Sequence, residues 1–253
     1  MEAYTGFAGV YDLFMDDIPY EEWCRYLVGL LRDHGVTDGL VAELGCGTGK
    51  MTRLLAGAGY DMIGIDRSDE MLGMAMEQRT PTGAADILYL QQDMREFELY
   101  GTVRAIASIC DSMNYLLEYE DLVRVLRLAN NYLDPGGVMI FDLNTVYKYS
   151  QLLGERTIAE NCEEGSFIWE NDYDEDTRIN EYDLTLYIRG TDGRFDRCEE
   201  THYQRAYTTD EVRRAIGEAG MEFVAAYDAF TKEPVREDSE RIYVIAREKG
   251  KKR

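Results

Sequence analysis

Three glycines at alternate positions, Gly45, Gly47 and Gly49, stand directly after a short apolar run at residues 40–44 and before a helical pattern. Glycine lacks a Cβ and adopts backbone angles closed to other residues, so such a turn lets a ligand lie against the main chain. Unpaired N–H groups at the start of the following helix favour a bound carboxylate or phosphate. The dinucleotide fingerprint has its third glycine one position later, where this chain has Lys50. The spacing is therefore GxGxG and not GxGxxG.

Two acidic residues accompany this turn. Glu43 precedes it, and Asp66 lies at the end of a second apolar run over residues 60–65. With these acids, the turn resembles the S-adenosylmethionine site of class I methyltransferases, and the resemblance spans nearly the whole chain. It implies an α/β fold with a doubly wound, Rossmann-like, mostly parallel sheet of seven strands. The chain resembles bacterial methyltransferase-domain proteins of unassigned substrate, and more distantly amino-sugar N,N-dimethyltransferases and glycine N-methyltransferase.

The resemblance implies S-adenosylmethionine as cofactor and assigns residues to its parts. The glycine turn suits the carboxylate, and Asp66 can accept hydrogen bonds from both ribose hydroxyls. Asp93 matches the acid that binds the adenine amino group, with Met94 supplying the next backbone N–H; ordinary turn chemistry is the alternative for Asp93. Residues 110–115 face the methyl group in relatives. The predicted cofactor-binding residues are Tyr11, Glu43, Gly45, Cys46, Gly47, Thr48, Gly49, Asp66, Arg67, Met71, Asp93, Met94, Asp111, Ser112 and Asn114.

The candidate catalytic residues are His202 and Tyr115. A neutral imidazole at His202 could take a proton from an ammonium or hydroxyl group as the methyl is transferred. The alternative is a histidine that only forms hydrogen bonds within a sheet. Tyr11 resembles part of the arm that glycine-type and amino-sugar N-methyltransferases fold over the cofactor, with core packing as its alternative. Trp23 is expected in the core, and Cys110 is expected to be a small residue packed at a strand end.

The elements that position these residues alternate between short apolar runs and amphipathic stretches, which indicates a parallel sheet covered by helices. An amphipathic helix over residues 20–34 precedes the first strand. Thr208 and Glu211 have the types and spacing of a capping box at the start of the last helix. In the resembled fold, the last two strands pair antiparallel at the sheet edge. Strands are predicted over residues 40–44, 60–65, 86–91, 103–109, 138–143, 221–230 and 241–247, and helices over 49–58, 69–79, 119–132 and 209–219.

Residues 155–207 interrupt this alternation. Tyr182, Leu184, Leu186 and Ile188 alternate with polar residues, which is typical of a strand with one buried face. The segment therefore predicts an inserted antiparallel β subdomain. The S-adenosylmethionine-binding domain would then comprise residues 1–154 and 208–253. The role of the insert remains open between a substrate lid and a dimer face, so a homodimer is one expectation.

Composition narrows the class of protein further. A chain of 253 residues with 45% apolar content can form one large α/β domain with an elaboration. Five scattered cysteines without a CxxC pair suit reduced thiols and give no metal-site pattern. Without a run of 18 apolar residues or a signal-peptide pattern, a cytoplasmic protein that is independent of membranes is predicted. A net charge of −22 would repel a phosphate backbone, which argues against nucleic acid as a partner.

The sequence thus predicts an S-adenosylmethionine-dependent methyltransferase for a small molecule with a nitrogen or oxygen acceptor, acting by direct in-line transfer. Residues 110–115 lack the Asn/Asp-Pro-Pro-Tyr pattern of enzymes that methylate base or glutamine amides, which also points away from nucleic acid. One alternative is a non-catalytic sensor or assembly module that binds the cofactor. Another is a nicotinamide-dependent oxidoreductase, which Lys50 disfavours.

Overall fold

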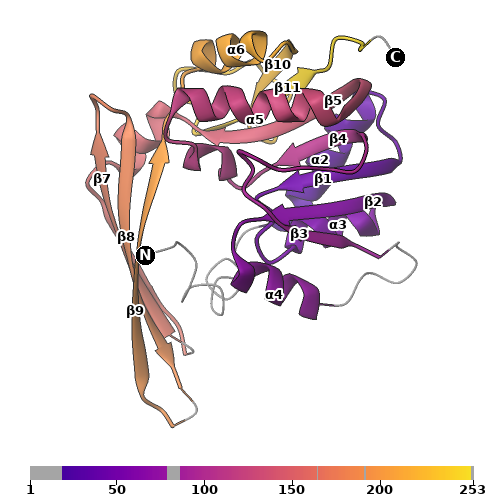
Figure 1. The fold of residues 1–253 in the computed structure, drawn as a ribbon. Helices are drawn as coiled ribbons and strands as arrows, with labels where there is room; N and C mark the ends of the chain where they lie inside the picture. Colours follow the sequence, from indigo (N-terminus) through magenta and orange to yellow (C-terminus); the bar gives the residue numbers. More distant parts are fainter. Residues whose placement is uncertain (1–18, 79–85, 164, 191, 252–253) are drawn as a thin grey trace.

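The structure is a computed structural model and describes residues 19–78, 86–163, 165–190 and 192–251. Tyr11 therefore lies outside the described residues. A seven-stranded sheet flanked by helices stands beside a separate four-stranded antiparallel sheet (Figure 1). This arrangement confirms the predicted fold class.

The seven-stranded sheet has the order β10-β11-β5-β4-β1-β2-β3. β11 runs antiparallel to both of its neighbours, whereas β1 to β5 pair in parallel. The carboxyl ends of the parallel strands therefore meet at one edge of the sheet. The strands are β1 Gly39–Leu44, β2 Tyr60–Asp66, β3 Leu88–Gln91, β4 Val103–Ser108, β5 Leu133–Asn144, β10 Glu222–Asp228 and β11 Arg241–Arg247.

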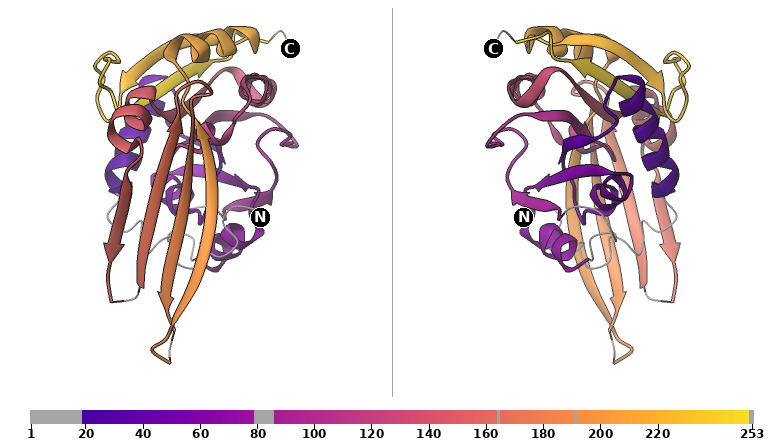
Figure 2. Two further views of the ribbon diagram at one scale, coloured as in Figure 1. Left: turned by 90° about the vertical axis from the view of Figure 1, so that its left-hand side faces the viewer. Right: turned by 90° about the vertical axis from the view of Figure 1, so that its right-hand side faces the viewer.

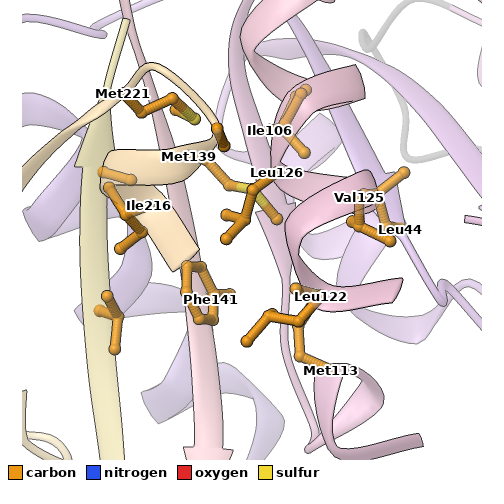
Figure 3. Close-up of a cluster of buried hydrophobic side chains, with 14 of the residues drawn as sticks. Leu44, Ile106, Met113, Leu122, Val125, Leu126, Met139, Phe141, Ile216 and Met221 are labelled. Carbon is orange, nitrogen blue, oxygen red and sulfur yellow. The ribbon is translucent and has the colours of Figure 1, made fainter. Parts of the chain in front are cut away.

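Helices cover both faces of this sheet, because each presents an apolar stripe to it. α2 and α3 pack on one face, and α5 and α6 on the other. On the second face, Leu122 and Leu126 of α5 and Ile216 of α6 gather with Met139 and Phe141 of β5 (Figure 3). α4 packs along β2 and β3. The helices are α2 Tyr20–Asp33, α3 Lys50–Gly57, α4 Asp69–Glu77, α5 Tyr119–Tyr132 and α6 Thr209–Glu218.

The four-stranded sheet is the predicted insert. It follows β5 through a π-helix, η2 (Lys148–Leu153), and its last strand leads to α6. The predicted alternation is present, since Leu184 and Leu186 are buried and Asp183 is exposed. The sheet stands across the carboxyl edge of the parallel strands (Figures 1 and 2). Its strands are β6 Thr157–Asn161, β7 Gly165–Asp174, β8 Ile179–Arg189 and β9 Phe195–Arg205.

Several predicted strand boundaries differ from the structure by one or two residues, and the start of β5 differs by five. β5 begins at Leu133 instead of residue 138, because Leu133 already pairs with Val103 before the register shifts. β10 ends at Asp228 instead of residue 230, because Phe230 adopts a φ of +62° and the N–H of Thr231 turns back to the Asp228 carbonyl. The capping box forms as predicted between Thr208 and Glu211.

Candidate active site

The glycine turn joins β1 to α3, and all three glycines have positive φ: +70° at Gly45, +54° at Gly47 and +71° at Gly49. At two of these positions, packing leaves no room for a residue with a Cβ. A Cβ at Gly45 would lie 2.6 Å from the Ser112 hydroxyl oxygen, and one at Gly49 would collide with Tyr89. A Cβ at Gly47 would meet nothing within 4 Å. Gly47 is therefore where the main chain opens toward a ligand.

Asp66, at the end of β2, fixes the conformation of this turn. Its Oδ2 accepts the Gly47 N–H at 2.8 Å, and its Oδ1 accepts the Ser68 N–H at 2.9 Å. Burial raises the pKa of Asp66, and these backbone hydrogen bonds oppose that rise. The backbone N–H of Arg67 also interacts with this carboxylate. Because two carboxylate oxygens offer about four acceptor positions, the group keeps capacity for a ligand hydroxyl.

Glu43, in β1, is buried beneath the turn with 2% of its surface exposed. The Thr52 hydroxyl donates to Oε2 of its carboxyl group. Burial raises the pKa of Glu43 to about 8, although the Thr52 hydrogen bond opposes the rise. At neutral pH this site therefore holds a proton that an exposed glutamate would have lost.

These elements enclose a cavity of about 180 Å³, here called the inner cavity. Its walls are the glycine turn, the end of β2, the segment after β3 and the turn after β4. Tyr20, Lys50 and Gln92 line it without having been predicted. The predicted cofactor residues that line it are Glu43, Gly45, Cys46, Gly47, Thr48, Asp66, Arg67, Met71, Asp93, Met94 and Ser112.

Asp93 lies in the inner cavity but already has a charged partner. The guanidinium group of Arg95 contacts both carboxylate oxygens of Asp93, at 3.0 Å through Nε and 2.6 Å through Nη2. The hydrogen bonds from this side chain lower the pKa of Asp93. An adenine amino group would therefore share this carboxylate with Arg95.

Among the predicted cofactor residues that the structure describes, three lie outside the lining of the inner cavity. Asn114 is fully buried, and its amide forms hydrogen bonds with the backbone of Asn144 and the carbonyl of Arg205. Gly49 packs beneath Tyr89. Asp111 faces the second cavity described below.

A second cavity of about 700 Å³, here called the outer cavity, lies between the carboxyl edge of the main sheet and the insert. Its lining includes Tyr115 and His202, the two predicted catalytic residues. Cys110 and Tyr115 line the inner cavity as well. The two cavities therefore share a wall formed by the turn after β4.

Tyr115 and His202 are in contact at this wall. The Tyr115 hydroxyl oxygen lies 3.2 Å from His202 Nδ1 and 2.6 Å from the Tyr182 hydroxyl oxygen. Tyr182 stacks on the His202 ring at a centroid distance of 4.8 Å, because the two residues are cross-strand partners in β8 and β9. On the other side of the ring, His202 Nε2 lies 3.2 Å from a carboxylate oxygen of Glu200, and both side chains are buried. The sheet thus fixes the orientation of the imidazole.

Trp23 packs against the core, as predicted, but it also has an exposed side. Its side chain is only half-buried, stacks on Phe230 at 5.1 Å and lines the outer cavity. The Arg241 guanidinium lies 5.2 Å from its ring centroid. Arg241 was not singled out from the sequence, and neither was its partner Asp142. An acidic residue within the apolar pattern of β5 was the available signal for Asp142.

A glycine turn with an open Gly47, an acid at the end of the next strand, and a seven-stranded sheet with β11 reversed define the class I S-adenosylmethionine-dependent methyltransferases. The chain belongs to this family. Residues 41–137 match the family model described as a methyltransferase domain. The chain is 32% identical to YqeM of Bacillus subtilis (strain 168), a protein named as a methyltransferase, and the match covers 96% of each chain.

Two further comparisons agree with this assignment. The solved structure of an S-adenosylmethionine-dependent methyltransferase from Clostridium acetobutylicum ATCC 824 is similar with a TM-score of 0.86 and 26% identity, over 98% of this chain and 100% of that one. A dTDP-3-amino-3,4,6-trideoxy-alpha-D-glucopyranose N,N-dimethyltransferase from Streptomyces venezuelae is 29% identical over 53% of this chain and 56% of its own length. No described helix is long and apolar enough to cross a membrane.

The residues of the inner cavity fit S-adenosylmethionine, the cofactor of this family. The open backbone at Gly47 would be filled by a Cβ in any other residue, which leaves space for a bound group. Asp66 offers acceptor capacity for hydroxyl groups beside it. When bound, the cofactor supplies a methyl group that its sulfonium has already activated. The residues around it have to orient the acceptor and exclude water.

Proposed function

We propose that this methyltransferase acts on a small molecule with a nitrogen or oxygen acceptor, with the cofactor in the inner cavity and the acceptor in the outer cavity. The observation that carries the proposal is the wall that the two cavities share at Cys110 and Tyr115. Reaction requires the two reactants to meet at a short distance with water excluded. A shared wall between a cofactor cavity and a larger second cavity supports that arrangement.

The groups at the shared wall support proton removal from the acceptor. An amine or hydroxyl acceptor gains the methyl group and loses a proton. His202 is held by Tyr115 on one nitrogen and faces the Glu200 carboxylate with the other. A neutral imidazole in this position takes the proton, directly or through the Tyr115 hydroxyl, and the buried carboxylate stabilises the resulting imidazolium.

The lining of the outer cavity supports a small acceptor of moderate polarity. Trp23, Trp169 and Phe230 contribute aromatic walls, and a volume of about 700 Å³ suits a metabolite. The Streptomyces venezuelae relative carries the name of an amino-sugar N,N-dimethyltransferase, which agrees with a nitrogen acceptor. The net charge of −22 opposes a polyanionic substrate.

The proposal is tested by incubating the protein with methyl-labelled S-adenosylmethionine and a bacterial metabolite extract. Label should enter a compound of low molecular mass. His202→Ala should lower that turnover by roughly 10²–10⁴ with unchanged cofactor affinity, because only proton removal is lost. His202→Gln, which keeps a polar side chain, should be impaired similarly.

His34→Ala provides the matched control, because the other histidine of the chain contacts Arg247 at 2.9 Å and lies outside both cavities. Its turnover should equal that of the parent. Equal turnover in His202→Ala and the parent would return His202 to a purely structural role. Cofactor binding without transfer to any compound would favour the alternative of a non-catalytic sensor.

A further inference from the structure

The wall between the two cavities has an unusual backbone conformation. Cys110 and Asp111 have φ values of +59° and +55°, so two consecutive residues with side chains occupy the left-handed region. This region is unfavourable for residues with a Cβ, and it persists only where the surroundings enforce it. Some group must therefore hold this turn in place.

The carboxylate of Asp142 meets both backbone N–H groups of the turn. Its Oδ1 accepts the N–H of Asp111 at 2.8 Å, and its Oδ2 accepts that of Cys110 at 3.2 Å. Successive N–H groups in such a turn form a concave site for an anion. Asp142 has no exposed surface, so its charge needs full compensation.

Arg241 supplies the compensating charge and extends the contact. Its guanidinium group binds Asp142 through Nη1 at 2.5 Å and Asp111 through Nη2 at 2.6 Å. The same turn is tied to the insert, because the side-chain amide of Gln204 donates to Asp111 Oδ2 at 2.7 Å. The Tyr149 hydroxyl donates to Gln204 at 2.8 Å. One buried network therefore joins β5, β11 and β9 at the shared wall.

We infer that Asp142 is a positioning residue for methyl transfer. Its carboxylate, held by Arg241, keeps Cys110 and Asp111 in the left-handed conformation and so sets the wall that carries Tyr115. The effect on the acceptor rests on the proposed function. The effect on the cofactor does not, because residues of this turn also line the inner cavity that fits the known cofactor. Measuring cofactor affinity therefore tests the role of Asp142 independently of any acceptor.

The test uses a glycine rescue. Asp142→Asn keeps the shape of the side chain, but its amide nitrogen cannot accept a backbone N–H. Calorimetry with S-adenosylhomocysteine should show affinity weakened roughly tenfold or more, as expected for loss of charge-assisted hydrogen bonds. Adding Cys110→Gly should recover most of the affinity, because glycine adopts positive φ without that support. Cys110→Gly alone is measured as the reference for the double variant, because Cys110 itself lines the inner cavity.

Glu248→Gln is the matched control. Glu248 is also buried and accepts two backbone N–H groups, from Gly136 at 2.8 Å and Gly250 at 2.7 Å, but it lies outside both cavities. This variant should keep full affinity for S-adenosylhomocysteine.

Unchanged affinity in Asp142→Asn, or no recovery with Cys110→Gly, would overturn the inference. If Asp142→Asn does not fold, Arg241→Lys replaces it, because a single ammonium cannot bridge both carboxylates in the same way. Arg241→Lys should weaken affinity for S-adenosylhomocysteine to the same extent, and Cys110→Gly should restore it. If either effect is absent, the inference is overturned. A failure of the extract assay would leave these calorimetric results standing.

Discussion

At the scale of single residues, Asp66 both builds the glycine turn and lines the inner cavity. Asp66→Ala should weaken S-adenosylmethionine binding at least tenfold, because charge-assisted hydrogen bonds to hydroxyl groups are worth ~1.5–3 kcal/mol each. Isothermal titration calorimetry measures the change. Asp61→Ala, which alters an exposed acid of the same strand, is the control. A dissociation constant equal to that of the parent would remove the ribose contact from Asp66.

The role of Gly47 in cofactor binding can be distinguished from the energetic cost of placing a larger residue at a positive φ. Gly47→Val places a branched side chain in the inner cavity and should abolish measurable cofactor binding. Gly59→Val carries the same type of backbone strain, since Gly59 has a φ of +102° and an equally open Cβ direction, but it lies away from the cavity. Circular dichroism should show both variants folded, and calorimetry should show binding only for Gly59→Val. Loss of binding in both would indicate global destabilisation.

Glu43 makes stability depend on pH. Burial raises its pKa from the ordinary 4.5 to about 8. Between these two pH values, the folded state therefore keeps a proton that the unfolded state has released. Its contribution to stability is complete below pH 4.5 and is lost as the pH rises through 8. The free energy of unfolding should therefore fall between pH 5 and pH 8 by roughly 2–5 kcal/mol more in the parent than in Glu43→Gln.

Urea denaturation at several pH values measures this difference. Glu222→Gln, at an exposed glutamate of β10, should follow the parent curve. Parallel curves for the parent and Glu43→Gln would show that Glu43 ionises normally in the folded protein.

Local residue types were enough to predict the glycine turn and the place of Asp66 at the end of β2, because both depend on backbone geometry next to them in the sequence. They gave no indication of the contacts that Asn114 and Trp23 form. The partners of Asn114 are Asn144 and Arg205, which lie in different elements far along the chain. Trp23 stacks on Phe230, which also lies far along the chain. Hydrophobic periodicity contains no information about either.

At the scale of elements, predictions succeeded where the signal was contained in a few residues. The capping box at Thr208 and the alternation along β8 are of this kind. The start of β5 was missed because Pro135 and Gly136 read as a turn, whereas pairing with β4 extends the strand back to Leu133. Strand limits in this sheet are set by neighbours that come from elsewhere in the chain.

The insert is the element whose removal is most informative. Replacing residues 160–203 with a short Gly-Ser linker should leave a folded protein that binds S-adenosylmethionine, because the main sheet and Gln204 remain. Methyl transfer should be lost with Tyr182, Glu200 and His202. Circular dichroism, calorimetry and light scattering measure the fold, the binding and the mass.

These measurements also separate the two roles considered for the insert. A parent dimer that becomes a monomer on deletion would assign the insert to a dimer face, whereas an unchanged mass with lost turnover would assign it to a lid. An unfolded chain would show that the insert belongs to the core and would contradict the division into domains.

At the scale of the whole molecule, the excess of acidic residues should direct the enzyme to substrates without a phosphate backbone. When labelled cofactor is offered with total RNA and a metabolite fraction together, label should enter the metabolite fraction. RNA stripped of bound metabolites serves as the control. Preferential labelling of RNA would overturn the proposed substrate class.

The buried amide of Asn114 also has a consequence for how the chain folds. It holds the end of β5 beside the end of β9, at Asn144 and Arg205. β5 must later pair with β11, about a hundred residues further along the chain, and closing so long a loop is slow. The hairpins of the insert form between strands that are close in sequence. Once Asn114 holds the ends of β5 and β9 together, the remaining loop that must close before β5 pairs with β11 contains only α6 and β10. The hydrogen bonds of Asn114 are therefore expected to offset the loop length that the insert adds between β5 and β11.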